Sequence, residues 1–130
     1  MKKETVRVPV ISDATERANV PLSAAVKAGG FVFVSGMPPI DAKTGRFVSG
    51  DIMKQTEACL ANLEAALDAA GSSLEKVVKV TVYASNSAYY SRINEVYARY
   101  FPKDPPARTF VTVASWPMEF DIEIECTALA

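Results

Sequence analysis

The stretch PPARTFVTVASWPMEFDIEIE, at residues 105–125, presents one arginine and two spaced glutamates on segments that alternate as β-strands do. Successive side chains of a strand point to opposite faces. In the first run, one face holds Thr109, Val111 and Val113, and the other holds Arg108, Phe110 and Thr112. After a turn at Pro117, one face holds Phe120, Ile122, Ile124 and Cys126, and the other holds Asp121, Glu123, Glu125 and Thr127. The stretch predicts two strands, the second with an acidic face.

Two interpretations of these charged residues are open from the pattern. Carboxylates at a two-residue spacing most often form the solvated outer face of a half-buried sheet, and a strand arginine is most often exposed. The alternative is a binding site in which Arg108 and the glutamates act together. The pattern alone favours the first interpretation. The order of the segments, a proline-led arginine, an apolar strand, a short loop and then an apolar strand with glutamates, shifts the balance toward the second.

The composition is that of one ordinary globular domain spanning residues 1–130. Of the 130 residues, 49% are hydrophobic and 22% are charged, and the formal net charge is -1. Lysine and arginine are scattered, so we expect no nucleic-acid partner. The N-terminal segment MKKETVRVPVIS has no signal-peptide core and no stretch reaches a membrane-spanning length, so we expect a cytoplasmic protein without a membrane partner.

The chain has no histidine, and this limits its chemistry. Ser-His-Asp and Cys-His catalysis and most zinc sites require histidine, so we expect none of these. The two cysteines, Cys59 and Cys126, fall on apolar faces and are expected to be buried free thiols. Any reaction must therefore use arginine, carboxylates, hydroxyls and backbone groups.

The rest of the chain predicts an α+β fold with a single mixed sheet. Residues 4–10 predict an edge strand because Pro9 cannot donate to a ladder, and the polar residues 12–19 predict a loop. Gly29 and Gly30 predict a hairpin turn between residues 24–28 and 31–35. Residues 77–84 are rich in β-branched side chains and predict a strand.

Two amphipathic helices are expected to pack on one face of this sheet. Helical spacing of apolar residues begins at Ile52, after a plausible N-cap at Asp51, and ends at Gly71. A second helix is expected to end at Pro102. Nothing in the chain is left to cover the other face, which we expect to carry Arg108, Phe110, Glu123 and Glu125. A mixed apolar and charged face suggests closure by another subunit.

Several short motifs resemble the RidA (YjgF) family, the reactive-intermediate deaminases, over residues from about Val20 to the end of the chain. The pieces are PAR at 106–108, IEI at 122–124, SG at 35–36, a KTG turn at 43–45 and Asn94 in the second helix. PAR alone is weak, but the combination is specific. The resemblance implies a chorismate-mutase-like fold, a homotrimer and pockets between neighbouring subunits.

The resemblance also implies a reaction. It is the hydrolysis of enamines and imines of the 2-aminoacrylate and 2-iminopropionate class to 2-keto acids and ammonia, as by a 2-iminobutanoate/2-iminopropanoate deaminase. Arg108 would hold the substrate carboxylate through two hydrogen bonds, and Glu123 would orient and deprotonate water. Glu125 would have a structural role, and the resemblance implies no cofactor and no metal. The expected substrate-binding residues are Leu22, Ser35, Asn94 and Phe110.

Two residues depart from the family pattern and keep alternatives open. Leu22 stands where relatives usually have a tyrosine, and Trp116 stands where they usually have a small or aliphatic residue. Both make the expected pocket more apolar, so a larger substrate such as 2-aminomuconate is one alternative. Another is a non-catalytic trimer that binds small carboxylates and acts as a regulator; retention of Arg108 favours the enzyme.

Overall fold

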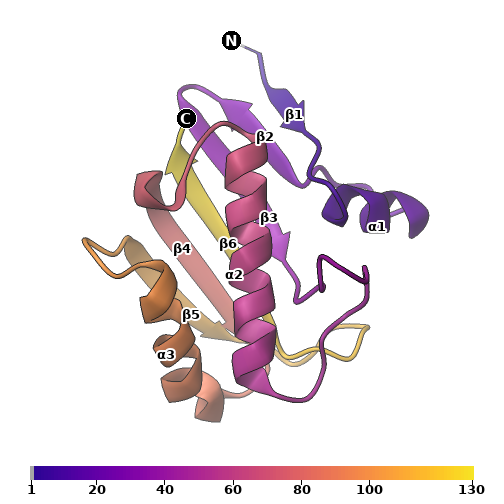
Figure 1. Cartoon of the computed structure of the whole chain (residues 1–130), viewed down its shortest axis with the longest axis vertical. Coiled ribbons are helices and arrows are strands. Elements are labelled where there is room, and N and C mark those ends of the chain that lie inside the picture. Colours follow the sequence, from indigo (N-terminus) through magenta and orange to yellow (C-terminus); the bar gives the residue numbers. More distant parts are fainter. Residues whose placement is uncertain (1) are drawn as a thin grey trace.

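Six strands form one mixed sheet in the computed structural model, which describes residues 2–130 (Figure 1). The strands are β1 (Glu4–Val6), β2 (Ala25–Ala28), β3 (Phe31–Met37), β4 (Val77–Ala84), β5 (Ala107–Thr112) and β6 (Ile122–Leu129). Their order is β1-β2-β3-β6-β4-β5, so β1 and β5 are the edges. Only β4 and β5 pair in parallel; the other pairs are antiparallel. The expected mixed sheet is confirmed.

The three helices are α1 (Ile11–Arg17), α2 (Ile52–Ala69) and α3 (Tyr90–Tyr100), with 3-10 turns at Leu74–Lys76 and Ser87–Tyr89. Helices α2 and α3 lie on the same side of the sheet, as predicted (Figure 1). Asp51 caps α2 by accepting a hydrogen bond from the backbone N–H of Met53 at 2.8 Å, and Gly71 follows it with φ 79°. Both boundaries of α2 that were inferred from the sequence are confirmed.

The core lies between α2, α3 and the inner face of the sheet. Leu60, Leu63 and Ile93 contribute from the helices and are fully buried, as are Val80 and Ile124 from the central strands. Burying a side chain of this kind contributes about 1.5–3 kcal/mol relative to leaving it exposed. Both cysteines are buried free thiols, as expected.

The opposite face of the sheet is more open. Along β3, Val32 and Val34 are buried, whereas Phe31 and Phe33 on the alternate positions are exposed. The two phenylalanine rings lie 6.3 Å apart. Apolar side chains are thus left in contact with water on the face that α2 and α3 do not cover.

The N-terminal segment differs from the sequence-based prediction. The strand ends at Val6 instead of continuing to residue 10, and the expected loop contains α1. Local hydrogen bonds stabilise this short helix: Ser12 Oγ accepts from the N–H of Val8 at 2.8 Å, and Asp13 accepts from the N–H of Val10 at 3.2 Å. The pattern concealed α1 because the helix has no apolar stripe; within it, only Ile11 and Ser12 are buried.

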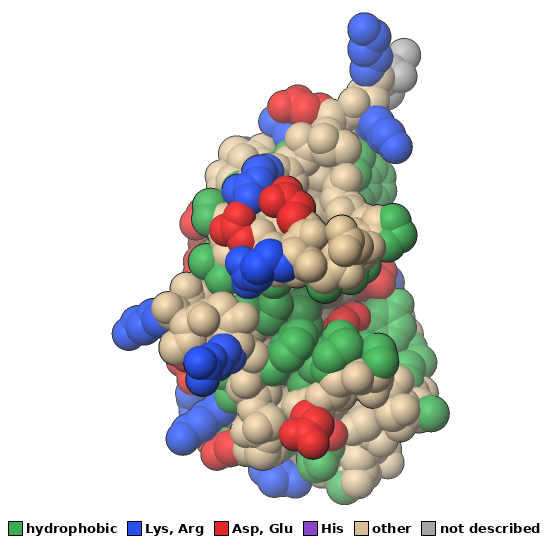
Figure 2. Space-filling view, turned by 90° about the vertical axis from the view of Figure 1, so that its right-hand side faces the viewer, with side chains coloured by type: hydrophobic (Ala, Val, Ile, Leu, Met, Phe, Trp, Pro, Cys, Tyr) green, Lys and Arg blue, Asp and Glu red, His purple; other side chains and the backbone are tan. Residues whose placement is uncertain are grey.

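Charges of both signs are interspersed around α1 in the side view of Figure 2. There, the Arg7 guanidinium lies against the carboxylates of Asp13 and Glu16. No helix in residues 2–130 is both long and apolar enough to cross a lipid bilayer.

Candidate active site

Glu123 points from β6 to the open face of the sheet. Its neighbour across the ladder is Tyr83 of β4, and Gly36 of β3 faces its carboxylate. These residues, with Trp116 and Glu125, line a hollow of about 320 Å³. Glu123 is therefore half-buried beside a space large enough for water and a small molecule.

The surroundings of Glu123 change its acidity. Burial raises the pKa of its carboxyl to about 7, which the Trp116 side chain opposes and the charge of Glu125 reinforces. A carboxyl with a pKa near neutrality exists in both protonation states at physiological pH. Glu123 can consequently accept a proton from water and return it.

Glu125 has a different environment from Glu123. Its carboxylate accepts a hydrogen bond from the hydroxyl of Tyr83 at 3.0 Å. Tyr83 lies on β4, and the bond links the two central strands on their open face. This contact supports a structural role for Glu125.

Arg108 lies on the other face of the sheet. Arg108 pairs with Val80 of the parallel strand β4, and the Val80 side chain is buried beneath the helices. The guanidinium carbon of Arg108 lies 4.8 Å from the ring centre of Tyr97 and 5.5 Å from that of Tyr90. One guanidinium nitrogen donates a hydrogen bond to the Tyr90 hydroxyl at 3.3 Å. Arg108 therefore packs on α3, in a cation–π arrangement.

This placement corrects the expectation that Arg108 and Phe110 share a face with Glu123 and Glu125. Phe110 pairs with the buried Val82 and faces α3, whereas Glu123 pairs with Tyr83, which neighbours Val82 on β4 and faces the other side. The alternation within each strand is as predicted. Only the relation between β5 and β6 was wrong, because the loop that joins them does not fix their relative parity.

Asn94 lies on α3 between Tyr90 and Tyr97, one turn from each, and thus on the helix stripe that contacts Arg108. The Asn94 side-chain oxygen and the Tyr97 hydroxyl are buried and have no hydrogen-bond partner within residues 2–130. Buried polar groups almost always have partners. Two unpartnered groups near one arginine are what a ligand or bound water would satisfy.

Ser35 lies on β3, and Leu22 lies in the segment before β2. The Ser35 hydroxyl donates to the carbonyl of Ser23 at 2.7 Å, and Leu22, the preceding residue, is 47% exposed. Ser35 also precedes Gly36, which faces Glu123. The structure thus separates the expected site residues into two groups, which we call the arginine group (Arg108, Asn94 and Phe110) and the glutamate group (Glu123 and Ser35). Leu22 belongs to neither group, because it lines a different hollow beside α1.

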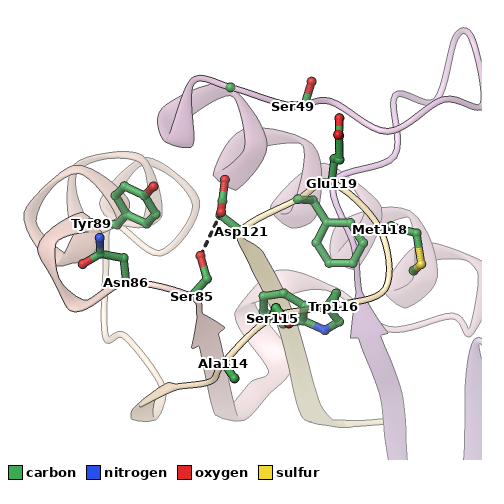
Figure 3. A pocket seen from close by; sticks show the side chains of 12 residues that line it. Ser49, Ser85, Asn86, Tyr89, Ala114, Ser115, Trp116, Met118, Glu119 and Asp121 are labelled. Carbon is green, nitrogen blue, oxygen red and sulfur yellow. Dashed lines mark hydrogen bonds between the residues drawn. The ribbon is translucent and has the colours of Figure 1, made fainter.

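Trp116 belongs to a loop that separates two hollows. Its ring packs on Phe120 with centroids 5.0 Å apart, and Phe120 in turn packs on Phe47 at 5.2 Å. On one side Trp116 lines the hollow of Glu123; on the other it lines a larger open hollow of about 650 Å³ (Figure 3). The aromatic stack fixes this loop against the segment before α2.

The larger hollow has a polar floor that the sequence did not reveal. The Ser85 hydroxyl donates to the Asp121 carboxylate at 2.8 Å, shown dashed in Figure 3, and the side-chain amide of Gln55 donates to the same carboxylate at 3.1 Å. Gln55 also accepts from the N–H of Asp121 at 2.8 Å. Because these groups satisfy one another, the network joins α2 to the ends of β4 and β6 and has a structural role.

Two further residues near the site escaped the sequence reasoning. Tyr90 contacts Arg108 directly, and its only signal was its spacing of four residues from Asn94. Gly36 belongs to the SG motif, but it is its lack of a side chain that leaves room for the Glu123 carboxylate. Residues 2–130 contain no cluster of three or more cysteine, aspartate or glutamate side chains suited to a metal ion.

Known proteins resemble this chain along nearly its whole length. The family described as Endoribonuclease L-PSP matches residues 13–130. The chain belongs to the RidA (YjgF) family. A member from Pyrococcus horikoshii, named RutC family protein PH0854, is 50% identical over 83% of this chain and 86% of its own length.

Two other RidA-family proteins carry functional information in their names. Reactive Intermediate Deaminase A, chloroplastic, from Arabidopsis thaliana is 40% identical over 98% of this chain and 66% of its own length. The protein in the crystal structure of E. coli TdcF with bound serine is 34% identical in sequence to this chain. The match covers 85% of this chain and 88% of the TdcF chain, with a TM-score of 0.79. The fold of this chain is thus a RidA-family fold.

Proposed function

We propose that this RidA-family protein hydrolyses enamines and imines of the 2-aminoacrylate and 2-iminopropionate class to 2-keto acids and ammonia. The observation that carries the proposal is Glu123, a half-buried carboxyl with a pKa of about 7 beside a hollow on the open sheet face. Imines hydrolyse without a catalyst, so one well-placed base and a fixed substrate can supply much of the rate.

Arg108 is the proposed anchor for the substrate carboxylate. Its guanidinium has five N–H donors, and only one makes a hydrogen bond within residues 2–130. The planar fork of the remaining donors matches a carboxylate through two parallel hydrogen bonds. Serine, the molecule bound to E. coli TdcF, carries a carboxylate beside an amino-bearing carbon, as 2-aminoacrylate does.

The reaction needs one water molecule and one proton shuttle. Glu123 takes a proton from water as the water oxygen bonds to the imine carbon, and it passes this proton to the nitrogen as the C=N bond becomes a single bond. Glu123 then takes the proton of the new hydroxyl as the C=O bond forms and the C–N bond breaks, and it delivers this proton to the departing nitrogen, which leaves as ammonia. Ser35 and Asn94 are proposed to contact the substrate, and the Asn94 oxygen is an acceptor for the imine N–H.

The arginine and glutamate groups lie on opposite faces of the same sheet, so we propose that the site forms between two copies of the chain in a homotrimer. Strand β5, which carries Arg108 and Phe110, is a free edge, and the open face exposes Phe31 and Phe33. An association that covers this face and edge would bring the arginine group of one copy to the glutamate group of the next.

A second candidate is a deaminase for a larger substrate, such as 2-aminomuconate. Leu22 is exposed and apolar, and Trp116 adds an indole beside Glu123. Both side chains favour a substrate with more apolar surface than 2-aminoacrylate. A non-catalytic carboxylate-binding trimer is the remaining alternative.

The deciding experiment generates 2-aminoacrylate from serine with a dehydratase and follows ammonia release with and without this protein. We expect faster release with the parent protein and little acceleration with Glu123→Gln. Equal release with and without the parent protein would reject the 2-aminoacrylate deaminase. A parallel assay with 2-aminomuconate then separates the two alternatives: faster consumption would support the second candidate, and no acceleration would favour the carboxylate-binding protein.

A further inference from the structure

The guanidinium of Arg108 lies beside the ring of Tyr90, which in turn packs on the ring of Phe110. Tyr90 is 45% exposed, and Phe110 is half-buried on the edge strand β5. The rings meet edge to face, with centroids 5.0 Å apart and planes at 80°. We call this pair the aromatic wall.

The wall and the arginine form one continuous surface. Tyr90 contacts both Arg108 and Phe110, because its hydroxyl accepts a hydrogen bond from Arg108 and its ring packs on Phe110. Arg108 and Phe110 are two residues apart on the same face of β5, which separates their backbones by about 7 Å. A carboxylate held by the guanidinium can therefore place the far end of its side chain against the rings.

We propose that the aromatic wall of Tyr90 and Phe110 selects carboxylate substrates with an aromatic or planar unsaturated side chain. This inference rests on the proposed role of Arg108 as carboxylate anchor and adds the substrate class that the same site prefers. It differs from a general preference for apolar bulk, because a branched aliphatic side chain of similar size would gain less from the wall.

The physical reason is the geometry of aromatic contacts. Two rings already fixed edge to face offer an incoming ring both an edge and a face, and an aromatic pair contributes beyond simple burial of area. A branched aliphatic group gains only burial. The measured range for one aromatic pair corresponds to about a 2- to 13-fold difference in affinity.

Binding of 2-keto acids to the whole protein tests the proposal without requiring turnover. Titration calorimetry compares phenylpyruvate with 4-methyl-2-oxopentanoate, which are the keto acids that correspond to phenylalanine and leucine. We expect phenylpyruvate to bind about 2- to 13-fold more tightly. The ratio should fall toward one in Phe110→Leu and in Tyr90→Leu, and the exposed position of Tyr90 makes the second variant the safer one for folding.

Tyr89→Leu is the matched control. Tyr89 lies one residue from Tyr90 and also stacks on an arginine, with the Arg92 guanidinium carbon 5.3 Å from its ring centre, but it does not pack on Phe110 or Arg108. This variant should keep the preference for phenylpyruvate. A preference lost equally in Tyr89→Leu would mean that the effect is not specific to the wall and would overturn the proposal.

The outcomes separate the wall from the deaminase function. A phenylpyruvate preference that Tyr90→Leu removes supports the wall even if ammonia release is not accelerated. Accelerated ammonia release with equal binding of the two keto acids overturns the wall and leaves the deaminase intact. No binding of either keto acid, or a preference unchanged in both wall variants, also overturns the wall.

Discussion

Gly36 and Glu123 approach each other so closely that no side chain fits between them: a Cβ atom on residue 36 would lie 2.6 Å from Oε1 of Glu123. This distance is far below van der Waals contact. Because the obstructing atom is the end of a flexible side chain, a larger residue at position 36 would displace the carboxylate rather than unfold the sheet. The position of the proposed base is thus set by a residue that has no side chain of its own.

Gly36→Ala should accordingly lower the rate of 2-aminoacrylate hydrolysis and leave the fold intact. A displacement of about 1 Å from the reacting geometry can cost about 100-fold in rate. The measurements are kcat and the thermal unfolding midpoint. If Gly36→Ala acts by moving Glu123, it should have no further effect in a Glu123→Gln background; additive losses would contradict this mechanism.

The rate should rise with pH through about 7, because Glu123 must be deprotonated to accept a proton from water and burial raises its pKa to about 7. Stability should change in the opposite sense. The folded pKa lies above the value of about 4.3 for an unfolded glutamate, so the free energy of unfolding should fall as pH rises between these values. Glu123→Gln should abolish both pH dependences.

Glu125→Gln is the matched control for the pH experiment. It lies on the same face of β6, but its partner is the Tyr83 hydroxyl. We expect the pH dependence of the rate to persist in this variant. Equal losses of rate in the two variants would show that the wrong carboxylate was assigned as the base.

Arg108→Lys should weaken carboxylate binding, because an ammonium cannot make the two parallel hydrogen bonds of a guanidinium. Loss of one hydrogen bond to a charged group, worth about 1.5–3 kcal/mol, corresponds to about 10- to 150-fold in affinity. Titration with pyruvate measures it. Arg92→Lys, which changes another arginine that stacks on a tyrosine, is the control and should bind as the parent does.

Arg108→Ala should additionally destabilise the fold, by about 0.5–2 kcal/mol, through lost stacking on Tyr90 and Tyr97.

Leu22→Tyr should shift the ranking of substrates toward the smallest imines. A phenol restores a hydrogen-bonding group worth about 0.5–1.5 kcal/mol, which is roughly tenfold or less in rate. The comparison uses imines derived from alanine, leucine and phenylalanine. An unchanged ranking would show that Leu22 does not touch the substrate.

The protein should be a homotrimer in solution, and Phe33→Glu should dissociate it. Phe33 is 46% exposed on the face that α2 and α3 leave open, and a carboxylate buried at an interface without a partner is strongly unfavourable. Light scattering at micromolar concentration gives the mass. Ala98→Glu, on the outer surface of α3, should keep the parent mass; a stable monomer in the parent protein would reject the shared site.

Much of the fold could be predicted because its main elements have strong local signals. The apolar period of α2 with its Asp51 cap, the β-branched run of β4 and the glycine pair of the β2–β3 hairpin each specify one structure. Helix α1 could not be predicted, since side-chain contacts of Ser12 and Asp13 stabilise it instead of an apolar stripe.

The relation between Arg108 and Glu123 could not be predicted for a different reason. Alternation specifies which residues of one strand share a face, but β5 pairs with β4 and not with β6. The faces of the two strands are therefore related only through a third strand. A long arginine side chain can also lie on the helix side at a sheet edge, where tyrosine rings accommodate its charge.

The position of Arg108 and Glu123 on opposite faces has a consequence for dilution. In the proposed assembly each site draws its anchor and its base from different chains, so an isolated chain holds both groups and still lacks a working site. The turnover of each chain would then depend on total protein concentration and would disappear below the dissociation constant of the assembly. The activity of each chain would thus rise with the amount of this protein in a cell.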